Sequence, residues 1–173
     1  IMREALEFCS ELKALGYSVF VQAVSITSYD DEEFATLLKL VNEVEPYAFS
    51  IVDTYGLLHK NQLIHYFEMA NDSLKQNISL GYHSHNNFQL GYANCIELAE
   101  KKIERNLLLD GSLYGMGKGA GNTPIELLAM YMRENRGANY HISQLLEAID
   151  VTIFSLSLTV LDYKDPKTLS EFE

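Results

Sequence analysis

Residues 78–87 read Ile-Ser-Leu-Gly-Tyr-His-Ser-His-Asn-Asn, an apolar run that ends in two histidines and two asparagines. A short, almost continuously apolar run followed by polar residues is typical of a strand buried on both faces of a parallel sheet. In a strand, His83 and His85 lie two positions apart, so their side chains point to the same face. Two neutral imidazoles so placed can bind one divalent metal ion. The stretch therefore suggests a metal site, against the alternative of a hydrogen-bonded histidine pair without metal.

Three further apolar runs recur around this one, and the spacing of about thirty residues is that of a βα unit. The four predicted strands cover residues 18–24, 48–52, 78–82 and 106–109. Helical patterns occupy residues 32–44, 60–74, 91–103 and 123–136. The acidic stretch 29–33 suits the positive end of a helix dipole, and Pro124 stands where a helix can begin without losing a hydrogen bond. We expect one more helix before the first strand and a C-terminal helix from about 142 to 161.

Successive βα units predict parallel strands joined by right-handed crossovers. Two architectures fit this pattern, a small doubly wound sheet and part of a (β/α)₈ TIM barrel. A complete barrel takes about 250 residues, whereas this chain has 173. The first element is a helix without a strand before it, which favours the half-barrel. We therefore expect one α/β domain over residues 1–173, with about four βα units of a TIM-type barrel and a C-terminal helix.

The composition excludes several classes of function. The chain has 24 acidic and 13 basic residues, and its net charge of −11 opposes nucleic-acid binding. No run approaches the roughly 18 apolar residues of a membrane span, and the opening residues lack a signal-peptide layout. Cys9 and Cys95 are expected to pack as apolar thiols rather than to form a disulfide. These features predict a cytoplasmic protein that binds neither membranes nor nucleic acids.

Polar residues follow each predicted strand, at the end where a barrel keeps its active site. They occupy residues 22–25, 53–56, 83–87 and 110–112. Asp53 and Thr54 have two interpretations, a turn with a helix cap or side chains that face the site. In the second interpretation, the Thr54 hydroxyl binds a carboxylate or carbonyl of a substrate.

Residues 115–122 read Gly-Met-Gly-Lys-Gly-Ala-Gly-Asn and form a predicted loop between the fourth strand and the next helix. Its backbone amides could hold an anion, or the loop could be only a tight turn against the barrel rim. It matches neither the phosphate-loop pattern nor the dinucleotide-binding fingerprint. Asn122 is a candidate oxygen ligand for the metal, or else only a helix N-cap, and both roles stay open.

Together these motifs resemble the HMG-CoA-lyase-like (DRE-TIM) metallolyase superfamily, and within it the 4-hydroxy-2-oxovalerate aldolases. The resemblance runs from about residue 19 to residue 146 and rests on the motifs at 53–56, 83–94 and 110–126. It implies a divalent metal, Mn²⁺ or Mg²⁺, bound by His83, His85 and an acidic residue near the end of the first barrel strand. It also places Thr54 where these aldolases contact substrate, and His83 beside the substrate.

The resemblance implies a metal-dependent carbon–carbon lyase, an aldolase, that acts on a small 2-oxo acid. In such enzymes the metal stabilises the negative charge that develops on the keto oxygen. The HMG-CoA lyases carry a Cys in the glycine-rich loop, and its absence from residues 115–122 argues against that activity. A Claisen-type acyltransferase of the same superfamily is an alternative, as is a non-catalytic, barrel-derived binding or assembly module.

The resemblance covers only the C-terminal half of the barrel. The Arg-Asp pair and the catalytic His of the family belong to the other half. We therefore expect the third metal ligand and the general base to lie outside this chain, and the isolated fragment to be inactive and to bind metal weakly. Half a barrel also leaves two sheet edges open, which a homodimer could cover.

Overall fold

The computed structural model of the protein describes residues 2–154. The elements in chain order are α1 (Met2–Ala14), β1 (Phe20–Ala23), η1 (Ile26–Ser28), α2 (Asp31–Val44), β2 (Ala48–Asp53), α3 (Lys60–Ser73), β3 (Ser79–Ser84), α4 (Gly91–Ala99), β4 (Leu107–Leu109), η2 (Leu113–Gly115), α5 (Ile125–Arg136), α6 (Ile142–Ala148) and η3 (Ile149–Phe154). Each of the four predicted strands is present.

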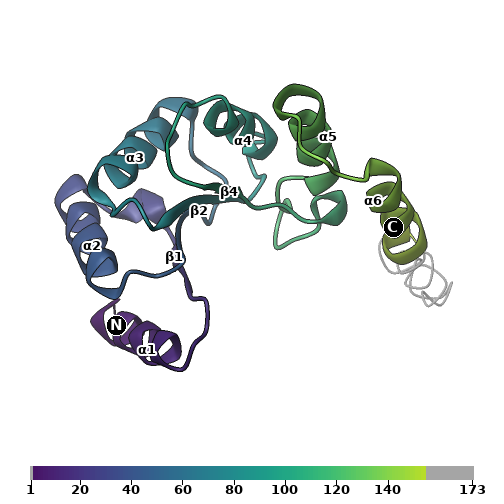
Figure 1. The fold of residues 1–173 in the computed structure, drawn as a ribbon. Helices are drawn as coiled ribbons and strands as arrows, with labels where there is room; N and C mark the ends of the chain where they lie inside the picture. The colour runs from purple at the N-terminus through teal and green to yellow at the C-terminus, as the bar shows by residue number, and fades with distance from the viewer. Residues whose placement is uncertain (1, 155–173) are drawn as a thin grey trace, which may run out of the picture.

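The strands form one parallel sheet in the order β1-β2-β3-β4. A strand order that follows the chain is that of a (β/α)₈ barrel, whereas a doubly wound sheet reverses its order near the middle. Figure 1 shows α2, α3 and α4 arranged in an arc along the outer side of the sheet. The parallel sheet and the interpretation as part of a TIM-type barrel are therefore confirmed.

The hydrophobic core lies between the sheet and these helices. It contains alternate residues of the central strands together with helix residues, namely Phe49, Ile51, Leu80, Tyr82, Phe34, Leu38, Leu63, Phe67 and Leu98. Burial of each large apolar side chain contributes about 1.5–3 kcal/mol. The other face of the central strands carries small residues, and a Cβ on Gly81 would lie 2.1 Å from Ser50 Oγ. A larger residue at position 81 would therefore force the Ser50 side chain to move.

Three expectations about element boundaries and burial need correction. Helix α4 ends at Ala99 rather than at 103, and the C-terminal helix is α-helical only to Ala148 before a π-helical segment that ends at Phe154. The part of the predicted helix from 155 to 161 lies outside the described residues. Strands β1 and β4 are only partly buried, and among residues 2–154 each of them has one neighbouring strand and not two.

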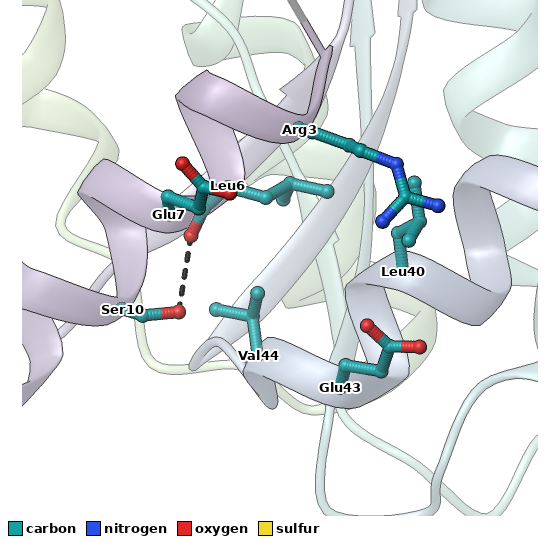
Figure 2. A pocket seen from close by; sticks show the side chains of 7 residues that line it. All are labelled: Arg3, Leu6, Glu7, Ser10, Leu40, Glu43 and Val44. Atoms are coloured by element: carbon teal, nitrogen blue, oxygen red, sulfur yellow. Dashed lines mark hydrogen bonds between the residues drawn. The ribbon is translucent and has the colours of Figure 1, made fainter.

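Helix α1 packs against α2, and Figure 2 shows the small cleft between them. The cleft has a volume of about 140 Å³ and is lined by Arg3, Leu6, Glu7, Ser10, Leu40, Glu43 and Val44. Ser10 Oγ donates to Leu6 O at 3.1 Å, so its hydroxyl is satisfied within its own helix. Lys13 Nζ donates to Val44 O at 2.9 Å and to Glu45 O at 2.6 Å. These bonds fix the end of α1 to the carboxyl end of α2.

A buried guanidinium, that of Arg105, stabilises the edge of the sheet at which the strands begin. Arg105 is 6% exposed and donates to Asn71 Oδ1 and O, Leu74 O, Lys75 O and Ile78 O at 2.7–3.1 Å. Several of these acceptors are carbonyls that the end of α3 leaves without helical partners. Burial lowers the pKa of Arg105 from its usual value. The five bonds join the loop before β4 to the end of α3 and to the loop between α3 and β3.

Replacing Arg105 with lysine should lower the free energy of unfolding by about 2–3 kcal/mol, because one ammonium cannot serve five acceptors in this planar arrangement. Urea denaturation measures the loss. Lys102→Ala, at an exposed position three residues earlier, is the control and should change little. A loss below about 0.5 kcal/mol in Arg105→Lys would contradict the assigned role.

Candidate metal centre

The carboxyl ends of the four parallel strands lie along one edge of the sheet, and His83 and His85 stand there at the end of β3. Their ring centroids are 5.4 Å apart, with an interplanar angle of 75°. Tyr82, the residue before His83 in β3, packs into the core between the sheet and the helices. Because successive side chains of a strand point to opposite faces, His83 faces the inner side of the sheet. Two imidazoles thus stand side by side at the edge where a barrel keeps its chemistry.

Each imidazole has its Nδ1 atom beside an acceptor. His83 Nδ1 lies 3.4 Å from Asp110 Oδ2, directly after β4. His85 Nδ1 lies 3.3 Å from the backbone oxygen of Lys118 in the glycine-rich loop. Within residues 2–154, neither Nε2 atom has a hydrogen-bond partner. Both Nε2 atoms are therefore available as ligand atoms.

The glycine-rich loop encloses the side chain of Asn122. Its Nδ2 donates to Met116 O at 3.1 Å and to Ser112 Oγ at 3.4 Å. Its Oδ1 is buried without a partner among the described residues. Asn122 also pairs with His85 through an isolated backbone bridge. The alternative role as a helix N-cap is wrong, because Pro124 occupies that position of α5.

The turn after β2 gives Asp53 and Thr54 different roles. Asp53 is 2% exposed, and its carboxylate accepts from Leu57 N at 2.9 Å and Leu58 N at 3.0 Å. The carboxylate therefore stabilises the turn after β2, but it does not cap a helix, because the N-cap of α3 is His59. Thr54 Oγ1 accepts from Ser25 N at 2.6 Å, which joins the ends of β2 and β1. The Thr54 hydroxyl hydrogen remains available to a ligand oxygen.

Gly56 supports the histidine segment, a role that the sequence motif did not reveal. Its φ is +62°, and a Cβ there would lie 2.5 Å from Asn87 N and 2.6 Å from His85 O. Phe88 N donates to Gly56 O at 3.2 Å, and His85 N donates to Asp53 O at 3.2 Å. The segment after β3 therefore packs directly against the turn after β2 and is hydrogen-bonded to it.

Asp110 is the second residue whose part in the site was missed. In sequence it was only one polar residue after a strand, and the pairing of β3 with β4 brings it beside His83. Among residues 2–154, no group of three or more His, Cys, Asp or Glu side chains is placed to hold a metal ion. The described residues therefore offer a partial donor set, two imidazoles and the orphan amide oxygen of Asn122.

Gly56→Ala should destabilise the chain by more than the cost of a left-handed backbone alone, because the added Cβ would meet the backbone at His85 and Asn87. Gly137 is the matched control, with φ +67° and no atom within 4 Å of where a Cβ would stand. Gly137→Ala should cost about 1–2 kcal/mol, and Gly56→Ala at least about 1 kcal/mol more. Urea denaturation of both variants measures the difference, and equal losses would contradict this role of Gly56.

Comparisons with known proteins bear on this arrangement. The chain is 30% identical over 118 residues to a 4-hydroxy-2-oxovalerate aldolase from Shewanella woodyi. The aligned region covers 66% of this chain and 34% of that protein. The chain is 28% identical over 144 residues to an oxaloacetate decarboxylase from Mycobacterium tuberculosis, which covers 83% of this chain and 41% of that protein. The chain therefore spans well under half the length of these curated relatives.

A crystal structure of an HMG-CoA lyase from Bacillus subtilis shares the fold, with a TM-score of 0.71 and 20% identity over 89% of this chain and 56% of that one. Within the described residues, no helix has the length and apolar character needed to cross a bilayer. The family model described as HMGL-like matches residues 1–153. The resemblance found in the sequence is thus confirmed, and the chain belongs to the HMGL-like family.

Proposed function

We propose that this chain forms the metal-binding half of a divalent-metal-dependent carbon–carbon lyase that acts on a 2-oxo acid in the cytoplasm. The observation that carries the proposal is the pair of imidazoles, His83 and His85, with free Nε2 atoms at the carboxyl edge of a barrel-type sheet. Two curated relatives support the reaction class, since the names aldolase and decarboxylase both denote cleavage of a carbon–carbon bond.

The residues present fit a Mn²⁺ or Mg²⁺ ion. His83 and His85 would supply nitrogen ligands, and the orphan Oδ1 of Asn122, whose backbone pairs with that of His85, would supply an oxygen ligand. Both ions favour oxygen ligands, which the Asn122 carbonyl and the oxygens of a 2-oxo acid would supply, and the choice of Mn²⁺ or Mg²⁺ follows from the resemblance to the family. When bound, such an ion supplies Lewis-acid stabilisation of the charge that develops on a keto oxygen. The third protein ligand and the general base are proposed to lie outside this chain.

Thr54 is the proposed contact for the substrate carboxylate. Its Oγ1 accepts from Ser25 N, which fixes the position of the oxygen between the ends of β1 and β2. The hydroxyl hydrogen remains free to donate, and a carboxylate oxygen is a strong acceptor for it. His83 stands one strand further along the same edge, so a short 2-oxo acid could reach both residues. Thr54 would therefore orient the substrate and His83 would face its reacting end.

Mn²⁺ should bind the chain weakly through the histidine pair, and electron paramagnetic resonance of free Mn²⁺ measures the affinity. His83→Ala and His85→Ala should each weaken binding at least about 10-fold, because each removes one of few ligands. His141→Ala removes an exposed imidazole from the start of α6 and serves as the matched control. If both site variants bind Mn²⁺ as the unmodified chain does, the proposed centre is wrong.

We also propose that the chain forms a homodimer, since in the described part of the chain β1 and β4 each pair with a single strand. Such edges present a row of free backbone donors and acceptors, which a second copy can pair. Size-exclusion chromatography with light scattering should give twice the 19.6 kDa of one chain. A stable monomer at high protein concentration would exclude the dimer.

A further inference from the structure

We propose that Asp110 is a positioning residue for His83: its carboxylate holds the imidazole proton on Nδ1 and leaves the Nε2 lone pair free for a cation. The inference rests on the proposed metal centre and adds a residue to it. Metal-binding histidines commonly donate their second nitrogen to a carboxylate or carbonyl, which fixes both the tautomer and the ring orientation.

The sheet itself places Asp110 beside His83. Tyr82 pairs with Leu109, so the next position of each strand brings His83 opposite Asp110. Asp110 N donates to Tyr82 O at 3.0 Å, which fixes the backbone below the carboxylate. Oδ2 then lies 3.4 Å from His83 Nδ1, which is within ion-pair distance, and the proposed role requires the carboxylate to turn toward the ring into hydrogen-bond geometry. An ionised carboxylate only accepts, so it favours a proton on the nitrogen that faces it.

A backbone carbonyl does the same for His85. The oxygen of Lys118 lies 3.3 Å from His85 Nδ1, and Gly121 N donates to that same oxygen at 3.2 Å. A carbonyl also only accepts, so it too favours a proton on Nδ1. Both rings are thus expected to have the same tautomer. The acceptor beside His83 is a side chain directly after β4, and the acceptor beside His85 is a backbone carbonyl of the glycine-rich loop. Both rings would present Nε2 to one ion.

A competing arrangement has the opposite tautomer. The 3.4 Å between Asp110 Oδ2 and His83 Nδ1 could also suit two ligands of one ion. In that case His83 would bind through Nδ1 and carry its proton on Nε2. The orientation of His85, whose Nδ1 faces Lys118 O, favours Nε2 as the common ligand atom. The tautomer of His83 therefore decides between the two arrangements.

Proton–nitrogen correlation spectra of the metal-free chain, with labelled histidine, identify the protonated nitrogen of each ring. The spectra are recorded over a range of pH, and the tautomer is identified in the form of each ring that carries a single proton. His83 and His85 should both carry the proton on Nδ1. In Asp110→Ala, His83 should shift to the Nε2-protonated form that an unrestrained imidazole favours, while His85 stays unchanged. Mn²⁺ affinity should fall about 10–100-fold.

Two variants serve as controls. Asp110→Asn keeps the shape and one acceptor oxygen, so it should recover part of the Nδ1 proton and of the affinity. Glu104→Gln removes one negative charge from an exposed position before β4 and should alter neither readout. Equal loss of affinity in Glu104→Gln would mean that net charge, and not positioning, governs binding, which would overturn the inference.

The spectra separate failure of this inference from failure of the metal centre. A proton on Nε2 of His83 in the unmodified chain, or an unchanged tautomer in Asp110→Ala, overturns the role of Asp110. Those outcomes leave the centre intact as long as His83→Ala and His85→Ala still weaken Mn²⁺ binding. If Asp110→Ala fails to fold, the tautomer of the unmodified chain and its response in Asp110→Asn decide the question.

Discussion

The backbone hydrogen bonding between parallel strands in chain order is the constraint on which the rest of this structure depends. The pairing of β2 with β3 runs from Ala48↔Ser79 to Asp53↔Ser84, and it is possible on the inner face because Gly81 leaves room for Ser50. All four strands then end at one edge. Polar residues that are about thirty positions apart in sequence become neighbours there, which is how a barrel assembles a site from separate βα units.

Local patterns predict most of the elements. The apolar runs predict all four strands, and the acidic stretch 29–33 predicts the start of α2, where Asp30 and Glu33 form a capping box. The predicted end of α4, residue 103, was wrong for a clear reason. Ile103 continues the apolar spacing of that helix but packs against the core from the loop after Ala99. Apolar periodicity records burial, and a loop residue can satisfy it as well as a helical one.

In the candidate site, too, some features follow from local sequence and others do not. The spacing of His83 and His85 within one strand indicates a shared face, and the two rings do lie together. The contacts of Asp110 with His83, of Thr54 with Ser25 and of Gly56 with the segment after β3 depend on strand register. Register joins positions that are about thirty residues apart, and no local pattern contains it. The orphan oxygen of Asn122 depends further on how the glycine-rich loop closes around it.

The position of Arg105 has a consequence for which substitutions the chain can tolerate over evolutionary time. Its guanidinium satisfies carbonyls before β3, at the edge of the sheet opposite the histidines. The buried guanidinium and the histidine pair therefore lie at opposite edges of the same sheet, joined by β3. Substitutions at exposed positions of the strand-end loops can therefore accumulate without disturbing the contacts of Arg105, whereas changes around Arg105 would lower the stability of the chain without touching the histidine edge directly.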